Sequence, residues 1–114
     1  MALNLKAGEL LVASPLHSEV LRLDAQTLEL IGRIPAHFGV RAVEIDPIRN
    51  WLICGSLVNN IVEVIDLESK KRLRAFHVAP WIHEFVLDPA SGTAYVSADG
   101  GLYRVQYVAP AKPR

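Results

Sequence analysis

The sequence predicts an all-β fold: a β-propeller-type antiparallel meander that supplies just under three four-stranded blades per chain. The first observation is an internal repeat with a period of roughly 42 residues, a length typical of propeller repeats. Identical residues carry it from copy to copy: Leu10 and Leu52, Ser14 and Ser56, Val20 and Val62, Asp24 and Asp66, and Asp46–Pro47 and Asp88–Pro89. The second observation is that short apolar segments alternate with polar turns, and no segment keeps a sustained helical period. Many short strands at even spacing are typical of propeller blades.

The middle copy, residues 40–81, is predicted to contain one complete blade. Its four expected strands, from the propeller axis outward, are Val40–Asp46, Trp51–Gly55, Ile61–Asp66 and Lys71–Val78. The segment DPIRN between the first two is a turn, because proline fixes φ at the corner and asparagine tolerates positive φ. Since every link is short, neighbouring strands are expected to pair antiparallel.

The outer copies are predicted to be partial blades. Residues 1–39 hold the end of an axial strand and then Glu9–Ser14, Glu19–Asp24 and Thr27–Ile34. Residues 82–114 hold Ile82–Asp88, Thr93–Ser97 and Leu102–Tyr107, lack an outer strand and end in a short tail.

An open stack of blades exposes two large apolar faces and is expected to need a partner. Either identical chains close a ring as a homo-oligomer, or the remaining blades belong to a longer propeller. The sequence leaves both alternatives open.

Composition excludes several classes of partner. The chain has 114 residues, of which 51% are hydrophobic, and its 12 Lys+Arg balance 12 Asp+Glu. A net charge of zero argues against nucleic acid or an anionic membrane as the partner. No apolar run reaches the roughly 18 residues that a membrane span needs, and the N-terminus is not a secretory signal. Cys54 is the single cysteine, so the sequence leaves the compartment undetermined.

Two segments resemble a known repeat. NNIVEVIDLESKKRLRAF, followed after a loop by FVLDPASGTAYVS, is similar to the YVTN-type β-propeller repeat. The residues that match its pattern are Asn60, Val62, Val64, Ile65, Asp66, Lys70, Asp88, Pro89, Gly92, Tyr95, Val96 and Ser97. The resemblance implies a propeller fold and a mostly bacterial or archaeal family, and it allows a periplasmic or extracellular location. Related propellers include lyases and lactonases, but no catalytic motif of theirs matches here, and fold alone does not imply activity.

The ligand site is expected at the mouth of the central channel. Arg41 and His83, which lie one repeat apart, occupy the same repeat position at the start of two axial strands. Arginine can hold a carboxylate or phosphate, and histidine can act as a base near neutral pH. Glu84 adjoins His83, and the aromatic residues Phe38 and Trp81 lie in equivalent links between blades. Exposed aromatics beside these charges would form a binding surface, whereas the alternative is that they pack between blades.

Other chemistries are not favoured by the sequence. The four histidines, His17, His37, His77 and His83, lack the close spacing of metal ligands, so neither a metal nor a cofactor is expected. Cys54 occupies a repeat position that is held by valine in the other two copies, at Val12 and Val96, which predicts a buried, inert thiol. The recurring Asp24, Asp46, Asp66 and Asp88 end strands, where a carboxylate accepts backbone N–H groups of the turn.

The functional hypothesis is therefore a binding or protein-interaction scaffold for a small-molecule or protein ligand, with no catalytic residue assigned. The alternative is a propeller lyase or hydrolase whose site lies at the same channel mouth and uses His83 as its base.

Overall fold

A computed structural model of the chain describes residues 1–108, and the tail predicted after Tyr107 lies outside that range from residue 109 onward. The described residues form three antiparallel sheets. The first contains β1 (Ala2–Asn4), β2 (Glu9–Ser14), β3 (Glu19–Asp24) and β4 (Leu30–Pro35), with a 3-10 turn at Pro15–His17. The second contains β5 (Val40–Asp46), β6 (Trp51–Ser56), β7 (Ile61–Asp66) and β8 (Arg72–His77). The third contains β9 (Glu84–Asp88), β10 (Thr93–Ala98) and β11 (Gly101–Gln106).

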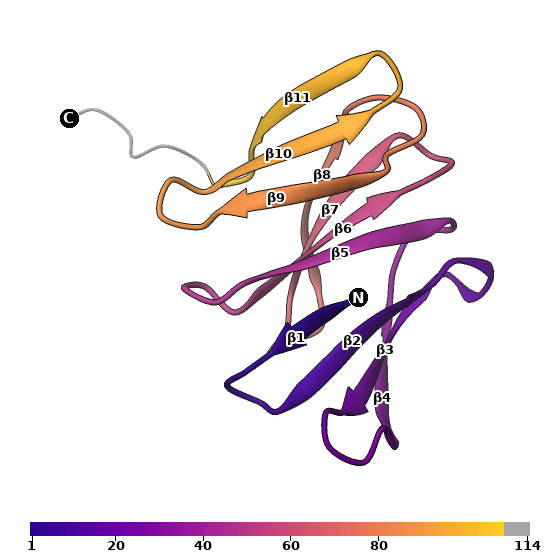
Figure 1. The fold of residues 1–114 in the computed structure, drawn as a ribbon, viewed down its shortest axis with the longest axis vertical. Coiled ribbons are helices and arrows are strands. Elements are labelled where there is room, and N and C mark those ends of the chain that lie inside the picture. Colours follow the sequence, from indigo (N-terminus) through magenta and orange to yellow (C-terminus); the bar gives the residue numbers. More distant parts are fainter. Residues whose placement is uncertain (109–114) are drawn as a thin grey trace.

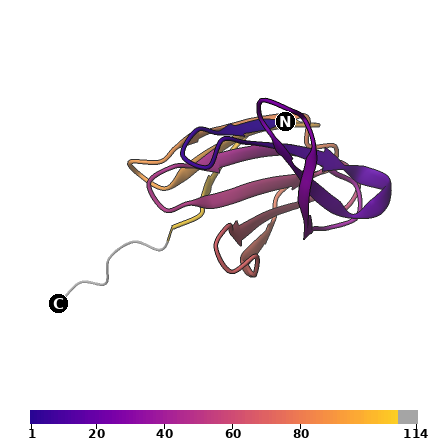
Figure 2. The same ribbon diagram turned by 90° about the horizontal axis from the view of Figure 1, so that it is seen from below.

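The sheets follow one another along the long axis of the molecule, with the first at the bottom of Figure 1 and the third at the top. Within each sheet the strands pair in sequence order, so each sheet is a simple meander. The strand β5 contacts both β1 and β9, which places the first strands of the three sheets side by side. In Figure 2 these first strands lie along the upper side, and β8 lies on the lower side. The all-β antiparallel meander predicted from the repeat is confirmed.

Three of the four aspartates at strand ends, Asp24, Asp46 and Asp66, accept backbone N–H groups of the turn as predicted, whereas the Asp88 carboxylate accepts the Ser91 hydroxyl. Asp24 Oδ1 accepts the N–H of Gln26 at 2.8 Å and of Thr27 at 2.9 Å. These backbone bonds, that of Thr27 first, lower the pKa of the Asp24 carboxyl. The turn then closes with a bond of 2.8 Å from Leu28 N–H to the Asp24 carbonyl, and Leu28 has a φ of 63°. This turn delays β4, which begins at Leu30 instead of the expected Thr27.

The turn after β7 repeats this geometry. The Lys70 N–H bonds the Asp66 carbonyl at 2.7 Å, and Lys70 has a φ of 61°. Asp66 Oδ1 accepts the N–H of Glu68 at 3.3 Å. Two turns that lie one repeat apart therefore share one backbone path, which is the structural counterpart of the sequence repeat.

Two apolar cores hold the sheets together. The core between the first and second sheets is built from Ala2, Leu11, Val20, Ile34, Val40, Val43, Leu52, Cys54 and Ile65. The core between the second and third sheets is built from Ile53, Val62, Val64, Ala79, Ile82, Phe85, Ala94, Val96, Ala98, Val105 and Tyr107. The second sheet is thus covered on both faces, which explains why its central strands are almost continuously buried.

A buried polar contact joins the second sheet to the third. Tyr107 donates its hydroxyl to Asp46 Oδ2 at 2.7 Å, and Asp46 is completely buried. Arg49 Nη1 donates to the same oxygen at 2.8 Å and to the Pro89 carbonyl at 2.7 Å. Burial alone would raise the pKa of the Asp46 carboxyl, but hydrogen bonds from Tyr107, Arg49 and the turn backbone outweigh it and lower that pKa.

The outward face of the first sheet carries a row of leucines. Strand register aligns Leu3 with Leu10, Leu10 with Leu23, and Leu23 with Leu30, across all four strands. Leu3 and Leu30 are 50% and 49% exposed, and the two central leucines are half-buried. No described part of the chain covers this face with a further sheet.

Candidate functional site

Three of the five predicted site residues line one hollow beside the first strands of the second and third sheets. The hollow has a volume of about 250 Å³. Arg41 reaches it from β5, Glu84 from the start of β9, and His83 from the residue before β9. Glu44, which the sequence analysis did not single out, also lines it. The structure therefore brings together charged groups that belong to successive copies of the repeat.

Backbone contacts position these side chains. The ladder between β5 and β6 shifts register between Val40 and Ala42, which leaves the exposed Arg41 at a bulge. The N–H of His83 bonds the Ser97 carbonyl at 2.8 Å, and this bond fixes the entry into β9. That strand begins at Glu84, instead of at Ile82 as the sequence predicted.

The electrostatics of the hollow are mixed. Burial raises the pKa of the Glu44 carboxyl; the amino group of Met1 opposes this shift and the Glu84 carboxylate adds to it. The nearest acidic group to the His83 ring is Asp99, with 3.7 Å between Nε2 and Oδ1. That distance exceeds a hydrogen bond, and both side chains are more than half exposed. No carboxylate in the described part of the chain therefore makes a hydrogen bond to the His83 ring.

The two predicted aromatic residues lie outside the lining of this hollow. Trp81 is 50% exposed and Phe38 is 52% exposed, and neither belongs to the two apolar cores. Trp81 has a φ of 57°, a left-handed conformation that costs a bulky residue about 1–3 kcal/mol. The residue that fills the space between the sheets is instead the fully buried Ile82. Half-exposed indole and phenyl rings leave both residues available for contact with a ligand.

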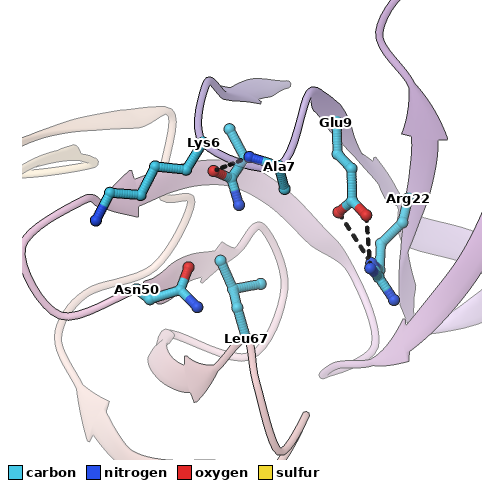
Figure 3. A pocket seen from close by; sticks show the side chains of 7 residues that line it. Lys6, Ala7, Glu9, Arg22, Asn50 and Leu67 are labelled. Carbon is cyan, nitrogen blue, oxygen red and sulfur yellow. Dashed lines mark hydrogen bonds and ion pairs between the residues drawn. The ribbon is translucent and has the colours of Figure 1, made fainter.

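A second hollow, of about 310 Å³, lies among the turns at the opposite end of the strands. Figure 3 shows the Arg22 guanidinium turned toward the Glu9 carboxylate in this hollow. Arg22 Nη2 donates to Glu9 Oε1 at 2.6 Å, and Arg22 Nε donates to Oε2 at 3.1 Å. In this bidentate pair the Arg22 guanidinium and the Glu9 carboxylate neutralise each other and use their hydrogen bonds on each other. The pair therefore stabilises the turn region and offers little net charge to a ligand.

Sequence reasoning missed a polar cluster between the first two sheets. The buried Glu63 on β7 contacts His37 from the link between β4 and β5, with 2.8 Å between Oε2 and Nδ1. Arg72 on β8 places Nη1 2.9 Å from His37 Nε2. The repeat could have indicated this cluster, because Glu63 is a charged residue at a position where the other two copies have the apolar residues Leu21 and Val105.

The remaining candidates do not gather into a metal-type cluster within the described residues. Cys54 is buried, and burial raises the pKa of its thiol well above the usual range, which agrees with the predicted inert character. His17 lies in the 3-10 turn, where Nδ1 is 3.0 Å from Ser14 Oγ, and His77 ends β8. Within residues 1–108, no three His, Cys, Asp or Glu side chains are grouped as a metal site would require. Among these residues there is also no helix of the length and apolarity that a membrane crossing demands.

Comparison with solved structures identifies the architecture. The chain is similar to hydrazine synthase of Kuenenia stuttgartiensis, with a TM-score of 0.77 and 21% identity over 87% of this chain and 28% of that one. It is also similar to the dihydro-heme d1 dehydrogenase NirN in complex with DHE, with a TM-score of 0.69 and 16% identity over 88% of this chain and 22% of that one. The chain has the β-propeller fold. Its three sheets are accordingly blades, stacked around the side on which β1, β5 and β9 lie.

The comparisons stop at the fold. No family model matches the chain. No curated protein matches it either. The chain spans less than a third of the two propeller proteins above, and at these identities their activities do not transfer to it.

Proposed function

We propose that this chain is a YVTN-type propeller repeat module that acts as a binding or protein-interaction scaffold. Its ligand would bind at the hollow lined by Arg41, His83 and Glu84, with Trp81 and Phe38 offering apolar contact nearby. The observation that carries this proposal is the convergence of those three ionisable residues, from two blades, on one hollow beside the axial strands. Concave sites with a few convergent polar groups, including those at the mouths of closed β-folds, are where ligands usually bind.

The geometry supports binding over catalysis. A propeller lyase or hydrolase with His83 as its base remains the alternative function. However, a general base works best when a neighbouring group fixes its tautomer, and the His83 ring is 53% exposed and 3.7 Å from its nearest carboxylate. Arg41 and the two glutamates instead offer fixed charges of both signs, which suit a ligand carrying both a carboxylate and an ammonium group.

A further blade is proposed to cover the leucine face of the first blade. The repeat counterparts of Leu10, Val12 and Leu23 in the second blade are Leu52, Cys54 and Ile65. Those counterparts are at most 2% exposed, because the first blade packs on them. The same positions in the first blade are therefore suited to be covered in the same way. The covering blade belongs either to a second copy of this chain or to the rest of a longer propeller.

The ligand site is tested by thermal-shift titration of the full chain with free amino acids, small dicarboxylates and simple sugars. The proposal predicts a saturable shift with at least one amino acid, and that Arg41→Ala and His83→Ala each abolish it. His17→Ala is the matched control, since His17 is an exposed histidine that does not line the hollow. A response that survives both site substitutions would place the ligand elsewhere and refute the assignment.

A further variant, His83→Gln, separates binding from catalysis. If His83 only contacts a ligand, His83→Gln, which keeps a hydrogen-bonding side chain, should retain much of the thermal shift. If His83 is a base, lyase or hydrolase turnover should appear in the wild-type chain and vanish in His83→Gln, even where ligand binding persists.

A further inference from the structure

The groove between the first two blades contains a second built polar site. It is lined by Pro35, Ala36, His37, Glu63, Lys70 and Arg72 and has a volume of about 290 Å³. None of these residues lines the axial hollow described above. Both walls belong to this chain, so the groove does not depend on what covers the leucine face.

The first blade lacks the charges of this groove. A shift by one repeat relates Glu63 to Leu21, Lys70 to Leu28 and Arg72 to Leu30. His37, in the link after the first blade, corresponds to Ala79 in the next link. In the third copy the sequence counterparts are Val105, Lys112 and Arg114, so the two positive positions recur there and Glu63 does not. Since the first blade folds with leucine at three of these positions, the blade structure does not itself require the charges. Their grouping in one groove indicates a role beyond holding the fold.

The contacts define how these groups are held. The Glu63 side chain is only 6% exposed, and its Oε1 accepts the backbone N–H of His37 at 3.3 Å. Its Oε2 lies 2.8 Å from the buried His37 Nδ1, which makes no regular hydrogen bond to the described residues. Arg72 Nη1 lies 2.9 Å from His37 Nε2. Because a guanidinium can only donate, this contact is a hydrogen bond in the tautomer in which Nε2 accepts and Nδ1, facing Glu63, carries the proton.

The result is a groove with net positive charge at its rim. Glu63 contributes one negative charge at the base, whereas Arg72 and Lys70 contribute two positive charges at exposed positions. The Arg72 side chain is 54% exposed, and its contacts in the described part of the chain are with His37 and, at 3.6 Å, with Glu63. Both contacts involve Nη1, so the rest of the guanidinium fork faces the groove opening or solvent with its donors available.

We propose that this groove binds a small oxyanion, a carboxylate or a phosphate group, between Arg72 and Lys70. Arginine matches the two oxygens of such a group with two parallel N–H bonds, and lysine adds a mobile point charge. Glu63 and His37 act as positioning residues: they hold Nη1 of Arg72 at the groove wall, so the remaining fork is ordered before the anion arrives. This preorganisation lowers the entropic cost of binding.

The test is an NMR titration of the full chain with inorganic phosphate and, separately, with acetate, with sodium chloride at matched ionic strength as the reference. We expect saturable shifts of the Arg72 Nε–H and His37 ring signals with phosphate, with acetate or with both, and none with chloride. The two arms show which oxyanion the groove prefers. Arg72→Gln and Lys70→Gln are each expected to weaken binding about tenfold, the loss of one charge-assisted contact.

Arg74→Gln is the matched control. Arg74 is an exposed arginine on the same strand, β8, where it pairs with Val64, and it does not line the groove. It should bind as the wild type does. Equal shifts with chloride, equal weakening by Arg74→Gln, or unchanged binding by both Arg72→Gln and Lys70→Gln would each overturn the proposal. Loss of stability in Arg72→Gln without any anion-dependent signal in the wild type would mean that the cluster serves only to join the blades.

Discussion

At the scale of single residues, the contact with the clearest energetic consequence is the buried bond from Tyr107 to Asp46. The two groups are far apart in sequence and come from the third and second copies of the repeat. A hydrogen bond to a charged group contributes more than a neutral one, and the carboxylate here is completely buried. This bond therefore ties the third blade to the second at a specific point.

Tyr107→Phe is predicted to lower the free energy of unfolding by about 2 kcal/mol, because it removes one of the donors to the buried carboxylate. Tyr103→Phe is the control, since Tyr103 donates to the Asp99 carbonyl at 3.4 Å near the surface and should change stability by less than about 0.5 kcal/mol. Urea unfolding followed by tryptophan fluorescence measures both. Equal losses in the two variants would mean that the bond to Asp46 has no special weight.

The same carboxylate gives a pH dependence with a definite sign. The pKa of Asp46 is lowered in the folded state, so its contribution is fully present above the usual aspartate value of 3.8 and is lost as the pH falls through the lowered value. The wild-type chain should therefore lose stability below about pH 4, and Asp46→Asn should flatten that part of the profile. Asp24→Asn should flatten it less, because the bonds to Asp24 are exposed.

At the scale of strands and links, the packing of β6 against the link into β9 depends on a glycine. A Cβ at Gly55 would lie 2.9 Å from Ile82 Cγ2 and 2.9 Å from Phe85 Cε1, both in buried side chains. Gly55 does not have a positive φ, so the constraint is the close approach of the two blades and not the backbone conformation.

Gly55→Ala is predicted to destabilise the chain by about 1–3 kcal/mol through overpacking. Gly32→Ala is the matched control, because a Cβ there meets only the flexible Arg22 side chain at 3.4 Å. Both substitutions restrict the unfolded chain equally, so their difference isolates packing. Thermal unfolding of the two variants decides the matter: a Gly55→Ala chain as stable as Gly32→Ala would show that the blades are not closely packed at this point.

The sequence predicted the strands well because their signal is local. Alternating apolar residues and Asp-Pro or Asp-x-x turns depend on neighbours in sequence, and the repeat presents them more than once. Strand starts were less accurate where a turn extends, as at Thr27, or where a link buries a residue before the strand begins, as at Ile82. Periodicity alone does not show that Ile82 fills the space between blades while Trp81 remains exposed.

The candidate site could be predicted only in part for the same reason. Arg41 and His83 were found because they share a repeat position, and repeat symmetry places them at one end of the axial strands. Other contacts join residues that do not share a repeat position, as in the Tyr107–Asp46 bond and the Glu63–His37–Arg72 cluster. Glu44 also has no charged counterpart that would have marked it. Such pairs depend on how blades face one another, which a single sequence does not report.

At the scale of the whole molecule, the two outer faces of the stack differ. The first blade presents the leucine row Leu3, Leu10, Leu23 and Leu30. The third blade presents Val86, Tyr95 and Arg104, which strand register places in one row, so its face is mixed. A contiguous apolar row such as the leucine row of the first blade marks an interaction face. A further blade is the partner proposed here, because an equivalent apolar face in the second blade already packs against a blade.

The most direct test of this account is the absolute mass of the purified chain, by light scattering after size-exclusion chromatography, together with binding of a hydrophobic dye. We expect either a defined multiple of the 12.6 kDa chain, if copies close the ring, or a monomer that binds the dye, if a longer propeller supplies the blade. Leu10→Glu with Leu23→Glu should abolish the association or the dye binding, whereas Leu28→Glu, in an exposed turn, should change neither. A monodisperse monomer that binds no dye and unfolds cooperatively would contradict the central claim that this arc of blades requires another blade to cover it.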